Sequence, residues 1–113
     1  MRIILCDDDT AFTQVFEKRL LTVFKEYGIT PEIVSAHTGV EALREITRRP
    51  TDVLFLDIDM PGKDGFSVAE ELTAMPSKPL IIFLSGMEDL VYQSFAFQPF
   101  WFLRKTHLEE LPQ

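Results

Sequence analysis

The sequence has few of the residues that stabilise secreted proteins or bind nucleic acids. Its 113 residues include a single cysteine, Cys6, which cannot form an internal disulfide. Only 11 residues are basic against 18 acidic ones, and the resulting net charge of −7 disfavours contact with a phosphate backbone. The composition therefore excludes an internal disulfide framework and argues against direct binding of nucleic acid.

Long hydrophobic runs are also missing. No apolar run approaches the roughly 20 residues that a membrane-spanning helix needs. The first run, Ile3–Cys6, is too short for a signal peptide. No internal repeat, low-complexity tract or linker interrupts a chain that is 46% hydrophobic and 26% charged. We therefore expect residues 1–113 to form one soluble, cytoplasmic domain without a membrane segment.

Five short apolar runs are the candidate strands. The first, third and fourth are continuously apolar, which is typical of strands buried on both faces of a parallel sheet. The runs are Ile3–Cys6, Ile33–Val34, Val53–Leu56, Leu80–Leu84 and Phe100–Leu103.

Amphipathic segments between these runs predict helices over residues 10–28, 39–49, 64–75 and 88–94. Thr10 and Asp64 are the expected caps of the first and third helices, and the only candidate for a fifth helix is the short tail after Lys105. The alternation predicts an α/β fold, a three-layer doubly wound sandwich. The expected inward-facing residues are Phe12, Val15, Phe16, Leu20, Val23, Phe24, Tyr27, Val40, Leu43, Ile46, Val68, Leu72 and Met75.

Polar residues collect where the predicted strands end. In a sheet of order 2-1-3-4-5, the crevice between the first and third strands would bring the aspartates that follow them together. Carboxylates in such a cluster repel one another, and a divalent cation relieves that repulsion. Oxygen ligands without histidine or cysteine favour Mg²⁺ over zinc. The polar set is Asp7, Asp8, Asp9, Asp57, Asp59, Ser85 and Lys105.

This arrangement predicts phosphoryl chemistry. Magnesium commonly takes phosphate oxygens as further ligands, and the Lys105 ammonium and Ser85 hydroxyl could contact the same phosphate. One of the aspartates could then act as a covalent acceptor.

Four motifs follow the predicted strands: Asp7-Asp8, Leu56-Asp57-x-x-Met60-Pro61-Gly62-x-Asp64-Gly65, Ser85-Gly86 and Lys105. In their order and spacing, these motifs resemble the receiver domain of two-component response regulators. The resemblance covers essentially the whole chain and implies a flavodoxin-like (βα)5 fold of strand order 2-1-3-4-5. Residues 95–105, rich in aromatics, are similar to receivers of LytTR-class transcription regulators, in which a β-type DNA-binding domain follows the receiver.

The resemblance assigns a role to each matching residue. Asp57 would accept the phosphoryl group from a histidine kinase. Asp8 would bind Mg²⁺ directly, Asp7 mostly through water, and Asp57 and the backbone carbonyl of Asp59 would complete the protein ligands. The protein would then be a phosphoacceptor that catalyses its own phosphotransfer and dephosphorylation rather than an enzyme acting on other substrates.

The same resemblance implies a conformational switch. Lys105 would pair with the acyl phosphate, Ser85 would move toward it beside the small Gly86, and Phe102 would turn inward. These changes would reshape the face formed by helix four, strand five and helix five. That face would control an output domain, which binds DNA in the LytTR class and is absent from these residues, and would support a homodimer.

Two other functions remain open. Asp57-Ile58-Asp59 matches the Asp-x-Asp of haloacid-dehalogenase-like phosphatases, although that motif follows the first strand in those enzymes. A receiver-like module that acts without phosphorylation is the second alternative. Among the other residues, Cys6 is expected in the core, and His37 and His107 are isolated in sequence and suggest no metal site.

Overall fold

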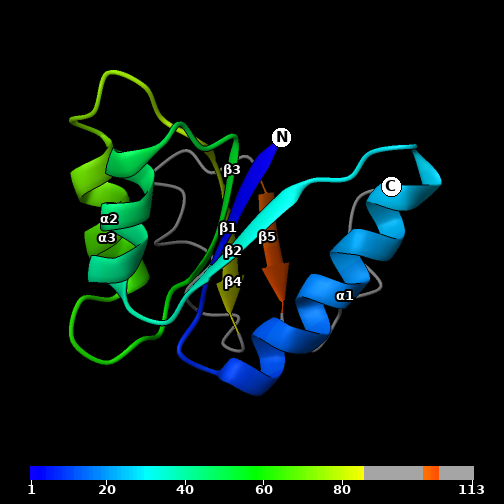
Figure 1. The fold of residues 1–113 in the computed structure, drawn as a ribbon. Coiled ribbons are helices and arrows are strands. Elements are labelled where there is room, and N and C mark those ends of the chain that lie inside the picture. The colour runs from blue at the N-terminus through cyan, green and yellow to red at the C-terminus, as the bar shows by residue number, and fades with distance from the viewer. Residues whose placement is uncertain (86–100, 105–113) are drawn as a thin grey trace.

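The computed structural model describes residues 1–85 and 101–104, and these form a parallel sheet with three helices (Figure 1). The strand order is β2-β1-β3-β4-β5, which confirms the predicted doubly wound α/β fold. The predicted helix over residues 88–94 and any fifth helix lie outside the described residues. The elements are β1 (Arg2–Cys6), α1 (Thr10–Glu26), β2 (Glu32–Ala36), α2 (Gly39–Arg48), β3 (Val53–Asp57), α3 (Gly65–Leu72), β4 (Leu80–Ser85) and β5 (Trp101–Arg104).

The sheet is covered on both faces, with α1 on one side and α2 and α3 on the other (Figure 1). Alternate residues of β1 enter two separate cores, Ile3 and Leu5 packing with the α1 residue Phe16, and Ile4 and Cys6 packing toward α2 and α3. Residues Ile3–Cys6 of β1 are buried, as their continuous apolar run predicts, and Arg2 at the start of the strand is buried as well. Within the described ranges, no helix combines the length and apolar character needed to cross a membrane.

The helix starts follow the predicted capping chemistry with one correction. The side chain of Asp64 caps α3 by accepting a backbone N–H group, as expected, and the side chain of Thr38 caps α2 in the same way. Thr10 is not the cap of α1; Asp9 is, because its extended backbone lets its carboxylate accept the N–H of Phe12 at 3.0 Å. Gly28, just beyond the end of α1, has φ +72°, a conformation that glycine adopts without steric penalty.

Three predicted core positions are wrong. Val15 and Tyr27 of the first predicted helix are 59% and 57% exposed, and Val40 at the start of α2 is 52% exposed. The sheet-facing stripe is narrower than the apolar pattern suggested, so that Ala42 rather than Val40 packs inward with Ile46. Helix α3 also ends at Leu72, earlier than predicted, and Met75 packs against the core from the following turn.

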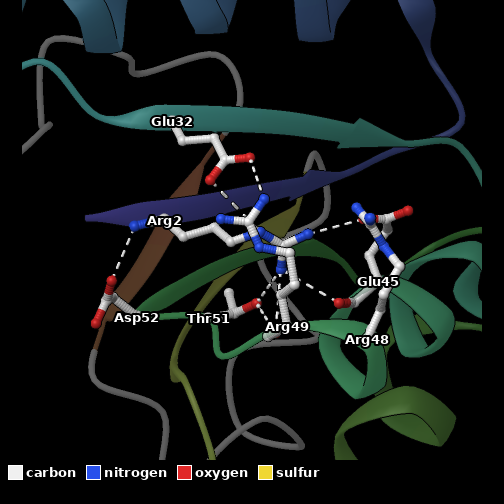
Figure 2. A network of polar contacts seen from close by, with 7 residues as sticks. All are labelled: Arg2, Glu32, Glu45, Arg48, Arg49, Thr51 and Asp52. Carbon is white, nitrogen blue, oxygen red and sulfur yellow. Dashed lines mark hydrogen bonds and ion pairs between the residues drawn. The ribbon is translucent and has the colours of Figure 1, made fainter.

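A buried arginine closes the amino end of the sheet (Figure 2). Arg2, only 5% exposed, donates to Glu45 Oε1 and to Thr51 Oγ1, both at 2.7 Å. Its backbone N–H also donates to Asp52 Oδ2 at 2.8 Å. This network ties β1 to the end of α2 and to the start of β3, at the edge opposite the acidic residues.

Candidate functional site

The carboxyl ends of β1 and β3 bring three aspartates together. Asp7, Asp8 and Asp57 each offer one carboxylate oxygen, and these oxygens lie within 4.8 Å of one another. Asp7 and Asp57 are buried, whereas Asp8 is exposed. The cause is the register of the two strands, which pairs Cys6 with Leu56 and so places the following residues at the same edge.

The β1–α1 turn holds the first of these carboxylates by local hydrogen bonds. Asp7 Oδ1 accepts the backbone N–H of Asp9 at 2.9 Å, and Asp9 in turn caps α1. The backbone N–H of Asp7 donates to Ala36 O of the neighbouring strand at 3.0 Å. The turn therefore fixes Asp7 in the interior and leaves the carboxylate of Asp8 at the surface.

The β3–α3 loop orients Asp57. Oδ1 of Asp57 accepts the backbone N–H of Asp59 at 3.3 Å. Farther along the loop, the N–H of Gly65 donates to the carbonyl of Ile58 at 3.0 Å, which brings the start of α3 directly against the end of β3. Asp59 itself is exposed.

The predicted switch residues are only partly within the described chain. Ser85 is the last residue of β4, one position beyond the Asp57–Leu84 pair, and Phe102 of β5 pairs with Phe83 of β4. The backbone thus places Ser85 on the strand next to Asp57, at the predicted edge. Gly86 and Lys105 lie outside the described residues.

Cys6 borders the acidic cluster as a buried thiol. Burial, with a further contribution from Asp57 and Asp7, raises the pKa of Cys6 to about 12. Its Sγ lies 3.5 Å from the carbonyl oxygen of Thr38 and 3.8 Å from Met60 Sδ. Cys6 therefore stays protonated at neutral pH, and its complete burial in the hydrophobic core confirms it as a core residue.

One contact to the site was missed by sequence reasoning. The ring Nδ1 of His37 lies 3.1 Å from the backbone carbonyl oxygen of Asp7. His37 is isolated in sequence, but it directly follows β2, the strand that neighbours β1. Its position after a strand was the available signal, because residues that follow neighbouring parallel strands share an edge.

The donor set suits a hard divalent cation. Among the residues that the structure describes, the grouped ligand candidates are carboxylates, with no histidine nitrogen or cysteine sulfur among them. Such oxygen ligands match Mg²⁺, which usually binds through one or two carboxylates, waters and a phosphate. The arrangement can place a cation beside the buried Asp57 and counter the negative charge gathered there.

Known proteins share this chain's sequence pattern. Residues 3–110 match the family model of the response regulator receiver domain. An uncharacterized response regulatory protein of Vibrio cholerae is 33% identical over 92 residues, 81% of this chain and 34% of that protein. The sensory transduction protein LytT of Bacillus subtilis is 26% identical over 110 residues, 97% of this chain and 44% of that protein. The chain thus spans less than half the length of these relatives.

The solved structures agree with the sequence relatives. The response regulator protein TrrA of Thermotoga maritima, solved in complex with Mg(2+)-BeF, superimposes with a TM-score of 0.74 at 27% identity, over 96% of this chain and 90% of that one. The match to LytT agrees with the predicted LytTR class. With the fold and the family model in agreement, this chain belongs to the response regulator receiver domains of two-component systems.

Proposed function

We propose that this receiver domain accepts a phosphoryl group on Asp57 from the phosphohistidine of a histidine kinase, with Mg²⁺ as cofactor. The observation that carries the proposal is the cluster of Asp7, Asp8 and Asp57, whose carboxylate oxygens lie within 4.8 Å of one another. Asp57, the proposed acceptor, is buried, whereas Asp8 is exposed to solvent.

Each residue of the cluster has a distinct role in this proposal. Asp8, Asp7, Asp57 and the backbone carbonyl of Asp59 would hold the Mg²⁺, which supplies positive charge to the phosphate oxygens. A carboxylate oxygen of Asp57 forms the new O–P bond as the N–P bond of the phosphohistidine breaks, and the bonding pair stays on the imidazole nitrogen. The N–H of Asp59, which donates to Asp57 Oδ1, orients the acceptor for this attack. Hydrolysis by water at phosphorus later restores the carboxylate.

In this proposal, phosphorylation changes the protein surface that contacts other domains. Lys105 and Ser85, next to Gly86, would contact the acyl phosphate, and Phe102 would turn inward. The altered face of helix four, β5 and helix five would then regulate an output domain, DNA-binding as in LytTR-class regulators, and promote a homodimer. In this proposal residues 1–113 are the receiver portion of a cytoplasmic transcription regulator.

The experiment is intact-mass spectrometry after incubation with Mg²⁺ and acetyl phosphate. The parent protein should gain one phosphoryl group, and Asp57→Asn should gain none. Asp59→Asn is the matched control, because it removes an exposed carboxylate two residues away and leaves the backbone carbonyl in place. EDTA should abolish the gain.

The alternatives predict different results. A module that acts without phosphorylation would gain no mass although it folds and binds Mg²⁺. A small phosphohydrolase would turn over a phosphate ester catalytically, and Asp59→Asn would then be inactive. The position of Asp57-Ile58-Asp59 after β3 rather than β1 argues against that enzyme class.

A further inference from the structure

We propose that His37 is a positioning residue for the metal site: its ring holds the Asp7 carbonyl, and this sets the position of the Asp8 carboxylate. The inference rests on the proposed function, because it concerns the Mg²⁺ site of the same cluster. His37 directly follows β2, and Asp7 and Asp8 directly follow β1, the neighbouring strand.

The hydrogen bond has a defined direction. His37 Nδ1 lies 3.1 Å from Asp7 O, and a carbonyl oxygen only accepts. Nδ1 must therefore carry the proton and donate it to Asp7. The backbone pairing of β1 with β2 ends with the Asp7 N–H bound to Ala36 O, and the His37 ring then supplies a donor for the carbonyl of the same residue.

His37 is itself held by the start of α2. Its backbone N–H donates to Glu41 Oε2 at 3.2 Å, while the N–H of Glu41 donates to Thr38 Oγ1 at 3.1 Å. This reciprocal pair resembles a capping box, with the acidic side chain bonded one residue earlier than usual. His37 is half-buried. These hydrogen bonds restrain its backbone and so limit where the imidazole can lie relative to Asp7.

The effect on Asp8 follows from the peptide geometry. The Asp7 carbonyl and the Asp8 N–H belong to one planar peptide unit, so holding the carbonyl also holds that plane. On the other side of Asp8, the N–H of Asp9 is bound by Asp7 Oδ1. The carboxylate of Asp8 is exposed, so the backbone of this turn is what fixes where it lies.

The test compares variants that lack a hydrogen-bond donor at the position of His37 Nδ1 with one variant that keeps a donor there. His37→Ala and His37→Leu remove the donor, and Leu also retains apolar bulk. His37→Asn places an amide N–H close to the position of Nδ1. We expect the two variants without the donor to bind Mg²⁺ about 3- to 10-fold more weakly than the parent, measured by isothermal titration calorimetry. Asn should restore the affinity to within about twofold.

A second measurement works on the metal-free protein. The backbone amide resonance of Asp8 should shift in His37→Ala and His37→Leu and return toward the parent position in His37→Asn.

The outcomes separate the inference from the proposed function. Parent-like Mg²⁺ affinity in the variants without the donor, or an equal loss in His37→Asn, overturns the positioning role alone. If the folded parent protein binds no Mg²⁺, the proposed cofactor is wrong, and the positioning role of His37 is then wrong as well.

Discussion

A β-carbon on Gly65 would lie 2.4 Å from the carbonyl oxygen of Asp57 and 2.7 Å from Cα of Ile58. Real Cβ atoms do not approach backbone atoms so closely, so only glycine fits at the start of α3. The N–H of Gly65 also donates to the carbonyl of Ile58. The first residue of α3 therefore packs directly against the end of β3, where the proposed phosphoacceptor Asp57 lies.

Gly65→Ala should push α3 away from β3. We expect the free energy of unfolding to fall by about 1–3 kcal/mol, the usual range for overpacking, measured by urea denaturation. Phosphorylation of Asp57 by acetyl phosphate should slow as well, because the loop that orients its carboxylate moves. Glu70→Ala, at an exposed position of the same helix, is the control and should match the parent. A Gly65→Ala protein with parent stability and rate would contradict this view of the loop.

Arg2 should be the most important charged residue for stability among those at the amino end of the sheet. Its buried guanidinium donates to two side chains and to the carbonyls of Glu45 and Arg49 (Figure 2). Arg2→Met keeps an apolar stem but removes these bonds, and it should lower the free energy of unfolding by about 1.5–3 kcal/mol.

Arg48→Met is the matched control for Arg2, because Arg48 donates to the same Glu45 oxygen at the same 2.7 Å. Its side chain is 58% exposed, so solvent screens the pair and the loss should be small. Equal losses from the two substitutions, measured by thermal and urea unfolding, would show that burial of Arg2 does not decide its contribution.

The Cys6 thiol should make stability fall at alkaline pH. Its pKa rises from 9.0 to about 12 on folding, first through burial and then through the nearby carboxylates. Between those values the unfolded chain loses this proton and the folded one keeps it, so unfolding becomes easier as pH rises. The decline should approach about 1.4 kcal/mol per pH unit.

The measurement is the free energy of unfolding across pH 8–11 for the parent and for Cys6→Ala. Subtraction of the two pH profiles removes the contribution of lysines and tyrosines. The parent should lose stability more steeply above pH 9, and its thiol should resist alkylation until the protein unfolds. Parallel profiles would mean that the thiol ionises as easily in the folded protein as in the unfolded one.

The sequence predicts those parts of the site that depend on the local pattern of apolar and polar residues. Continuous apolar runs located β1, β3 and β4, and the acidic residues directly after the first two had to share an edge once the sheet was parallel. The same local pattern identified Asp64 as the cap of α3. It chose Thr10 over Asp9 because both residues are good caps and only the backbone conformation separates them.

The sequence by itself determined the fold class, the strand order through its family pattern, and the residue types available for a magnesium site. Only the tertiary structure decided that Val15 and Val40 face solvent, that Arg2 is buried, and that His37 reaches Asp7. The physical reason is that periodicity specifies which residues can share a face, whereas burial and long-range hydrogen bonds depend on neighbours far away in the chain. His37 and Asp7 are 30 residues apart and meet only because β1 and β2 pair side by side.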